Sequence, residues 1–202
     1  VPDRPTDGAA MRAAPLGVWW AARDLDREAA FEAIRPVLAV THRHPAALAA
    51  GWGQAVAVHT LLGWTPDAFD RAAFWERLVD ATAWAEGRLD GDDRVSGRLE
   101  ALADHLDAFP LNLGDACDGV GIRADEAWPF ACAMVARRAH LLENTLLSGI
   151  NVGGDADTTG AMMGAMLGAL HGWSAFPNEW GEGLEAFDRL EAEARALAGA
   201  LS

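Results

Sequence analysis

The most informative stretch of the sequence is Asn151-Val152-Gly153-Gly154-Asp155-Ala156-Asp157-Thr158-Thr159-Gly160. Two glycines precede three side chains that carry oxygen, those of Asp155, Asp157 and Thr158, and a strongly helical run follows. Mg²⁺ and Mn²⁺ bind carboxylate and hydroxyl oxygens, and neighbouring positions of a turn can converge on one ion. The two glycines would let the backbone approach a ligand closely. The pattern therefore predicts a divalent-metal site at the start of a helix.

A simpler interpretation of the same stretch is an ordinary helix N-terminus. Asp155 would then be the N-cap, and Asp157 would interact favourably with the helix dipole. The spacing of the two acidic residues does not separate this interpretation from metal binding.

After Gly160, glycine recurs at every fourth residue, at Gly164, Gly168 and Gly172. A glycine inside a helix costs about 0.5–1 kcal/mol relative to alanine, so we expect close packing on this face to offset the loss. The apolar run over residues 160–170 is far shorter than the roughly 20 residues that a membrane span needs. The pattern predicts a central core helix and argues against a transmembrane one.

Apolar residues recur at helical spacings along most of the chain, and strict alternation over the length of a strand is hard to find. The clearest helix start is Thr65-Pro66-Asp67, an N-cap followed by proline at the first helical position. A chain of 202 residues is long enough for a sizeable core, so we expect a single domain over residues 1–202. The predicted fold class is all-α, a compact multi-helix bundle, with helices over residues 24–40, 45–62, 65–85, 92–108, 124–147 with a break, 158–172 and 182–201. Either Asp24 or Asp26 can cap the first of these helices.

The composition limits the class of partner. The formal net charge of −14 argues against a nucleic-acid surface and against an anionic membrane, since both require a basic face on the protein. The two cysteines, Cys117 and Cys132, stand in apolar settings, and the N-terminus does not resemble a signal peptide. These features favour a cytoplasmic location and give neither cysteine a catalytic role.

Several ordered segments resemble the ADP-ribosylglycohydrolase family. The stretch over residues 151–165, with Pro177 and Trp180 after it, is similar to the family's C-terminal signature. Residues 6–17, Thr-Asp-Gly-Ala-Ala-Met-Arg-Ala-Ala-Pro-Leu-Gly, resemble its Asn-Gly-Ala-Ala-Met-Arg-x-x-Pro-Leu-Gly segment, and Thr41-His42-Arg43-His44-Pro45 resembles its Thr-His-x-His-Pro segment. Gly119-Val120-Gly121 looks like the loop before the penultimate core helix. The similarity spans almost the whole chain.

This resemblance implies an all-helical bundle around a cleft with two Mg²⁺ or Mn²⁺ ions. It also implies a hydrolase that removes ADP-ribose from a modified side chain of a protein or from a related small-molecule acceptor. By motif match, the metal ligands would be Asp155, Asp157 and Thr158, and the two carboxylates would be the catalytic residues.

The same resemblance implies a set of contacts to ADP-ribose, with Gly8 beside the phosphates and His42 as a polar contact. Without the resemblance, His42 is more simply interpreted as a helix-capping or core histidine. Arg12 is expected to be a structural ion-pair partner near Asp7. The full set of expected substrate contacts is Asp7, Gly8, His42, Gly121, Asn151, Gly153 and Gly154.

Two positions depart from the family's pattern. Asp7 stands where the family usually has asparagine, which replaces an amide donor by an anion near the expected diphosphate. Ile122 stands where an aromatic residue often covers the adenine. We expect both changes to weaken ADP-ribose binding, the first by repulsion and the second by loss of stacking.

Family members also carry an upstream Thr-Asp-Asp-Thr motif that completes the metal pair, and the sequence starts downstream of it. Three explanations are open: a fragment of a longer protein, a second polypeptide that supplies the missing segment, or a reduced relative. We therefore expect one ion or none in this chain alone, and little turnover without the missing segment. The alternative to a hydrolase is a non-enzymatic ADP-ribose-binding or structural protein with an incomplete metal site.

Overall fold

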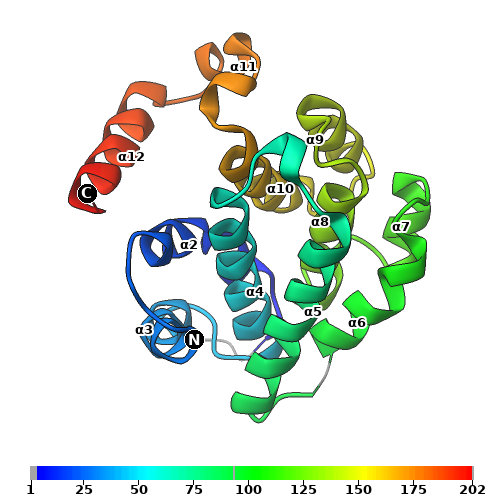
Figure 1. Ribbon diagram of the computed structural model, residues 1–202. Coiled ribbons are helices and arrows are strands. Elements are labelled where there is room, and N and C mark those ends of the chain that lie inside the picture. The colour runs from blue at the N-terminus through cyan, green and yellow to red at the C-terminus, as the bar shows by residue number, and fades with distance from the viewer. Residues whose placement is uncertain (1–3, 93, 202) are drawn as a thin grey trace.

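Helix α4 (Pro45–Leu62) lies at the centre of the fold. The structure is a computed structural model that describes residues 4–92 and 94–201. Every residue of α4 from Ala46 to Leu61 is buried except His59, and many of these residues are alanine or glycine. Small side chains let neighbouring helices approach closely, and Figure 1 shows α4 between α2 and α3 on one side and α5 and α8 on the other.

The described chain is helical throughout, which confirms the predicted all-α class. The one β-type pairing among the described residues is an isolated bridge between Thr6 and Arg123. Short 3₁₀ turns lie at Pro66–Ala68, Ala103–His105 and Trp173–Ala175. The other helices are α1 (Gly8–Met11), α2 (Ala14–Ala21), α3 (Arg27–Ala39), α5 (Arg71–Arg88), α6 (Arg94–Leu102), α7 (Pro110–Ala116), α8 (Ala124–Arg138), α9 (Leu142–Ile150), α10 (Ala156–His171), α11 (Asn178–Glu182) and α12 (Phe187–Leu201).

Several helix boundaries are confirmed where a local signal fixes them. Helix α4 has the predicted bounds and begins with Pro45. Asp26, not Asp24, is the N-cap of α3, and its Oδ1 accepts a hydrogen bond from the Ala29 amide at 2.8 Å. The predicted break between residues 124 and 147 separates α8 from α9, while Pro129 lies inside α8 without ending it.

Other predicted boundaries are wrong. Thr65-Pro66 begins only a 3₁₀ turn, because Phe69 is extended and a second cap takes over: Asp70 Oδ1 accepts from the Ala73 amide at 3.0 Å, and α5 begins at Arg71. The helix predicted over residues 92–108 ends at Leu102. The helix predicted over residues 182–201 is divided between α11 and α12, and Ala186 between them has a φ of +57°.

The close packing expected along the glycine stripe of α10 is found at Gly160 but not at Gly164 or Gly172. Helix α10 does pack against α4, α8 and α9, but it does so through its large apolar face, which is made of Met162, Met163, Met166, Leu167 and Leu170. A Cβ atom on Gly164 would meet nothing within 4 Å, and one on Gly160 would lie 3.0 Å from a methyl group of Ile150.

Among the described residues, no helix is long and apolar enough to cross a membrane.

A buried polar link ties three core helices together. Gln54 of α4 donates through Nε2 to the Met162 carbonyl of α10 at 3.1 Å, and its Oε1 accepts from Trp128 Nε1 of α8 at 2.9 Å. Both polar ends of the buried amide are thereby satisfied, which a buried side chain of this kind requires. The link holds the start of α10 against the centre of the fold.

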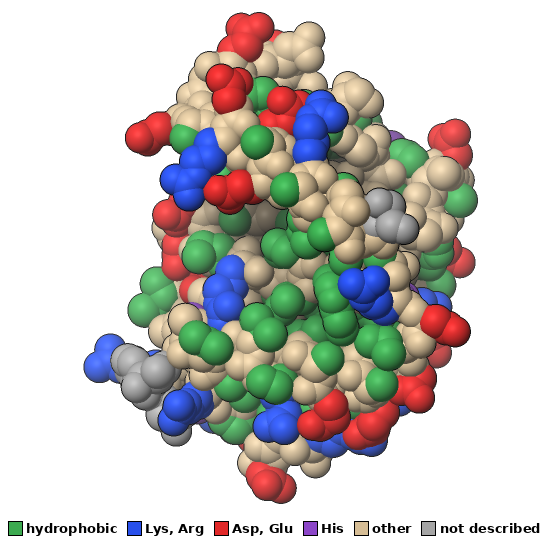
Figure 2. All heavy atoms as spheres, turned by 90° about the vertical axis from the view of Figure 1, so that its left-hand side faces the viewer, with side chains coloured by type: hydrophobic (Ala, Val, Ile, Leu, Met, Phe, Trp, Pro, Cys, Tyr) green, Lys and Arg blue, Asp and Glu red, His purple; other side chains and the backbone are tan. Residues whose placement is uncertain are grey.

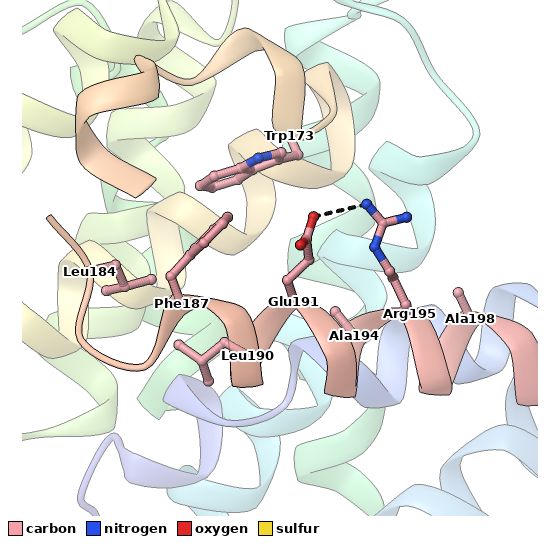
Figure 3. A pocket seen from close by; sticks show the side chains of 8 residues that line it. All are labelled: Trp173, Leu184, Phe187, Leu190, Glu191, Ala194, Arg195 and Ala198. Carbon is pink, nitrogen blue, oxygen red and sulfur yellow. Dashed lines mark hydrogen bonds and ion pairs between the residues drawn. The ribbon is translucent and has the colours of Figure 1, made fainter. Parts of the chain in front are cut away.

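Helix α12 stands apart from this core and buries none of its described residues. An apolar hollow of about 440 Å³ lies against this helix (Figure 3). The rings of Trp173 and Phe187, which line it, are 5.6 Å apart, and Leu184 and Leu190 also line it. Figure 2 shows hydrophobic side chains gathered over this face of the molecule. The hollow lies at the C-terminal end of α10, so it is separate from the acidic residues at the start of that helix.

Candidate functional site

A short loop between α7 and α8 joins the two acidic segments of the chain. The carbonyl oxygen of Val120 accepts a hydrogen bond from the Asp155 amide at 2.7 Å, and that of Ile122 accepts one from the Asp7 amide at 3.0 Å. The bridge between Thr6 and Arg123 continues this contact. Residues from opposite ends of the sequence are therefore brought to one place, just before α1 and just before α10.

The two glycines before Asp155 allow the Asp155 segment to approach the loop that contains Val120. Both have positive φ angles, +91° at Gly153 and +70° at Gly154. A Cβ atom on Gly154 would overlap the carbonyl oxygen of Val120, whereas one on Gly153 would meet nothing within 4 Å. The sequence predicted a close approach by the backbone to a ligand, and the structure shows a close approach to another loop of the protein.

Three carboxyl groups meet at this junction. Asp7 is 4% exposed, Asp155 is half-buried and Asp157 is exposed. The pKa of Asp7 is raised to about 7, first by burial and then by the nearby charges of Asp155 and Asp157. The pKa of Asp157 is lowered, first by a hydrogen bond with the Asp155 side chain and then by the Thr158 amide, which donates to Asp157 Oδ1 at 2.9 Å.

This cluster has no cationic partner in the described part of the chain. None of the ten ion pairs there includes Asp7, Asp155 or Asp157. One oxygen of Asp7, Oδ2, is buried and has no hydrogen-bond partner in these residues. Buried acidic oxygens without a donor or a cation are costly, so the arrangement fits an added cation.

The N-cap interpretation of Asp155 is not supported by the geometry. Asp155 occupies the N-cap position of α10, but its side chain accepts no capping hydrogen bond. The hydroxyl of the buried Thr158 contacts only the sulfur of Met11, at 3.5 Å, and sulfur is a weak acceptor. Carboxylate and hydroxyl oxygens of this motif are therefore available to a ligand.

The donor set suits Mg²⁺ or Mn²⁺, which prefer oxygen ligands. Among residues 4–92 and 94–201, no three acidic, histidine or cysteine side chains are already grouped closely enough to hold a metal. Carboxylates repel one another when no counterion is present, so we expect a metal ion to draw these side chains closer together.

His42 lies next to the acidic segment that precedes α1. A Cβ atom on Gly8 would lie 2.9 Å from both Cε1 and Nε2 of His42, so the ring rests directly on the glycine. Its Nδ1 is 2.8 Å from the hydroxyl of Thr41. Burial, and then the charge of Arg12, lower the pKa of His42, which keeps the ring neutral at neutral pH. The helix cap suggested for a histidine here belongs to His44, whose Nδ1 accepts from the Ala46 amide at 3.2 Å.

Arg12 does not form the expected ion pair. Its Nη2 donates to the carbonyl oxygens of Val37 at 3.0 Å and Leu38 at 2.8 Å, at the C-terminal end of α3. Carbonyl groups at a helix end lack intrahelical partners and carry the negative end of the helix dipole, so they attract a guanidinium as a carboxylate would. Arg12 therefore orders α3 and does not neutralise Asp7.

The comparison with known proteins identifies the family. The family model described as ADP-ribosylglycohydrolase matches residues 3–202. The chain belongs to the ADP-ribosylglycohydrolase family. It is 28% identical over 194 residues to an uncharacterized protein of Escherichia coli (strain K12), YegU, and the match covers 92% of this chain and 56% of YegU.

Two mammalian relatives match a shorter region. The chain is 31% identical to ADP-ribosylhydrolase ARH3 of Mus musculus and 29% identical to that of Homo sapiens, each over 114 residues that cover 50% of this chain. The match spans 31% of each mammalian protein. The chain therefore spans only part of the length of the relatives it matches.

The remaining predicted contacts differ in how accessible they are to a ligand. Gly121 faces Glu126, and a Cβ atom there would lie 3.1 Å from a carboxylate oxygen. Ile122 is 60% exposed, so its side chain is accessible where the family often has an aromatic ring. Asn151 ends α9, where its Nδ2 donates to the Leu147 carbonyl at 2.8 Å. The amide nitrogen of Asn151 is thus used by its own helix.

The sequence alone did not predict that Asp7 lies near Asp155 and Asp157. No spacing in the sequence signals this proximity, because it depends on the loop that holds Asp7 and Asp155 together. The expected contact of Asp7 with the diphosphate stays a prediction.

Replacement of Gly154 by alanine should strongly destabilise the protein. The new Cβ atom would overlap the Val120 carbonyl and force the loop apart, at a cost of about 3 kcal/mol or more. Gly153→Ala, which also has a positive φ but open space, is the matched control and should cost about 1–2 kcal/mol. Urea unfolding of both variants measures the difference, and equal losses would contradict the proposed contact.

In EDTA, Asp7→Asn should stabilise the protein at high pH. The pKa of Asp7 rises from 3.8 to about 7 on folding, so the contribution of Asp7 to stability is fully present below about pH 4 and is lost as the pH rises through 7. Asparagine does not titrate. The thermal midpoint of the variant should therefore exceed that of the wild type by a few degrees at pH 8 and approach it at pH 4. A difference that is the same at both pH values would show that the Asp7 charge is not the cause.

Proposed function

We propose that this protein is a divalent-metal-dependent hydrolase that cleaves the glycosidic bond between ADP-ribose and a modified side chain or a related acceptor. Family membership supports the glycohydrolase chemistry and ADP-ribose as the common part of the substrate. The observation that carries the metal dependence is the uncompensated group of Asp7, Asp155 and Asp157 beside the hydroxyl of Thr158, which donates only to the weak acceptor sulfur of Met11.

In this proposal, Asp155, Asp157 and Thr158 hold Mg²⁺ or Mn²⁺. A bound divalent ion supplies an electrophile that orients oxygen ligands and lowers the pKa of a water molecule. The carboxylates of the chain also balance the positive charge that develops on the ribose as the glycosidic bond lengthens. Asp155 is held rigidly for this role by its backbone bond to Val120, and Asp157 by its bond to the Thr158 amide.

The region around α1 supplies the binding surface for ADP-ribose. Gly8 presents backbone without a side chain, and the neutral ring of His42 lies against it. A neutral imidazole can donate one hydrogen bond and accept another, which suits a polar contact without a second cation. His42 is therefore proposed as a binding residue and not as the catalytic base. The two cysteines are buried and free, which suits a reducing compartment such as the cytoplasm.

The second candidate function is binding of ADP-ribose without turnover. The exposed Ile122 favours it, since an aliphatic side chain does not stack on adenine as an aromatic ring does. Hydrolysis measurements separate this candidate from the enzyme.

Asp157→Asn should abolish metal-dependent hydrolysis. Release of ADP-ribose is followed from a panel of ADP-ribosylated proteins and small molecules, in Mg²⁺, in Mn²⁺ and in EDTA, with the upstream segment that carries the Thr-Asp-Asp-Thr motif supplied, because the sequence predicts little turnover without it. We expect turnover only with metal, and a loss of about 100-fold or more in the variant, because a ligand oxygen and a negative charge near the reacting carbon are both removed. Asp67→Asn, which changes an exposed acidic residue in the 3₁₀ turn Pro66–Ala68, is the control. Binding of ADP-ribose without turnover by the wild type would favour the binding protein.

His42→Ala should weaken ADP-ribose binding while leaving the fold intact. Loss of one polar contact is worth a factor of about 10 in affinity. His44→Ala is the matched control: it removes the cap of α4 and should lower stability by about 1 kcal/mol without changing affinity. Calorimetric titration and thermal unfolding measure the two effects. A His42 variant that binds normally but unfolds early would make His42 a structural residue.

A further inference from the structure

A second hollow opens between α4 and α5, with α2 and α3 at its edge, and none of the residues of the candidate site lines it. Its volume is about 360 Å³, within the range of roughly 300–1,000 Å³ that is usual for small-molecule sites. The two main helices each contribute residues at spacings of three and four, which places them on one helix face. These residues are Val56, His59 and Thr60 of α4 and Arg77, Asp80 and Ala81 of α5.

The hydroxyl of Thr60 is a buried polar group that lines this Arg77 hollow without a partner. Thr60 is 4% exposed, and its Oγ1 has no hydrogen-bond partner among the described residues. A threonine inside a helix can donate to the carbonyl group four residues earlier, as Thr82 of α5 does to the Leu78 carbonyl at 2.8 Å. Because an unpaired buried hydroxyl is costly, a ligand that accepts its hydrogen bond would remove that cost.

The charged side chains of the Arg77 hollow give it one net positive charge. Arg27 and Asp80 neutralise each other, since Arg27 Nη1 lies 2.5 Å from Asp80 Oδ2. The guanidinium of Arg27 also lies over the ring of Trp84, 4.6 Å from the centroid, so Arg27 is held at two places. Arg77 takes part in none of the ten ion pairs of the described residues. A guanidinium is therefore available to an anion, although the protein as a whole has a net charge of −14.

The imidazole of His59 forms a flat wall of the hollow. It stacks on Trp20, with the ring centroids 4.0 Å apart, and Trp20 stacks in turn on Trp52 of the core. Trp20 Nε1 donates to the Leu25 carbonyl at 3.0 Å, which fixes the indole. Burial, and then the charge of Arg77, lower the pKa of His59, so the ring is neutral at neutral pH. This wall is rigid and adds no second charge to the hollow.

We propose that the Arg77 hollow binds a small organic carboxylate with an apolar body. The guanidinium of Arg77 can form two parallel hydrogen bonds with a planar carboxylate, and the hydroxyl of Thr60 can donate another. The apolar body would lie along Val56, Ala81 and the ring of Trp20. An inorganic anion would use the charge and leave the apolar wall unfilled, so the lining favours an organic one. This site is independent of the proposed hydrolase activity.

Benzoate is the probe that tests the proposal, because it joins one carboxylate to a flat apolar ring. Benzamide has nearly the same shape without the charge, and inorganic phosphate has charge without an apolar body. Calorimetric titration at pH 7.5 measures the binding of each compound. We expect saturable binding of benzoate at one site, and binding at least about 10-fold weaker for benzamide and for phosphate, because neither satisfies both the guanidinium and the apolar wall.

Arg77→Gln should weaken benzoate binding by about 10-fold or more, because it removes the charge that pairs with the carboxylate. The side chain of Arg77 is exposed, so we expect the variant to fold as the wild type does. Arg189→Gln, which changes an exposed arginine of α12, is the matched control and should bind benzoate normally.

Thr60→Val should weaken benzoate binding by a factor of about 3 to 10 without destabilising the free protein. Valine keeps the shape and removes an unpaired buried hydroxyl, so the thermal midpoint without ligand should stay the same or rise by a few degrees. Thr82→Val is the matched control: it breaks the bond to the Leu78 carbonyl, so it should lower the midpoint and leave benzoate affinity unchanged.

Three results would overturn the proposal. The first is no saturable binding of benzoate to the wild type, and the second is binding that Arg77→Gln and Thr60→Val both leave unchanged. The third is equal affinity for benzoate and for either benzamide or phosphate, which would show that the hollow does not select an organic carboxylate. A Thr60→Val variant that unfolds early and binds benzoate normally would make the Thr60 hydroxyl structural and remove it from the site.

Discussion

Two backbone hydrogen bonds to one short loop set the geometry of the candidate site. Val120 and Ile122 accept from the amides of Asp155 and Asp7, respectively, and these contacts require the main chains to lie about 3 Å apart at their polar atoms. Gly154 meets this constraint because it has no Cβ atom to collide with Val120. The meeting of the acidic side chains follows from this arrangement of the backbone.

The hydrophobic core also holds the segments that carry Asp7 and Asp155 in place. Helices α1 and α10, which begin directly after Asp7 and Asp155, both pack against α4. The small residues of α4 allow that approach, and the apolar face of α10 and the link through Gln54 hold α10 in register with α4 and α8. Burial of apolar surface, which is non-directional, thus provides the rigid base on which directional polar contacts position the site.

The electrostatics of the site contrast with those of the rest of the protein. Elsewhere many of the described arginines and carboxylates pair at the surface, as in the contacts of Arg27 with Asp80 and Arg88 with Glu28. The acidic residues at the start of α10 have no such partners, and the net charge of −14 gives no general attraction for a diphosphate. In the proposed function, a divalent ion resolves both problems, because it neutralises the carboxylates and presents positive charge to the ligand.

The sequence by itself determined the helical class, the bounds of α4 and the motif over residues 153–158, and it left the cap of α3 open between Asp24 and Asp26. Such features depend on residues close together in the chain, whose backbone preferences and capping bonds are local. Local signals predicted the wrong helix start where two possible N-caps lie close together, as Thr65 and Asp70 do before α5. The buried face of α10 and the meeting of Asp7 with Asp155 were decided only by the tertiary structure. Each depends on packing partners and backbone contacts from distant segments, which no local pattern of residues specifies.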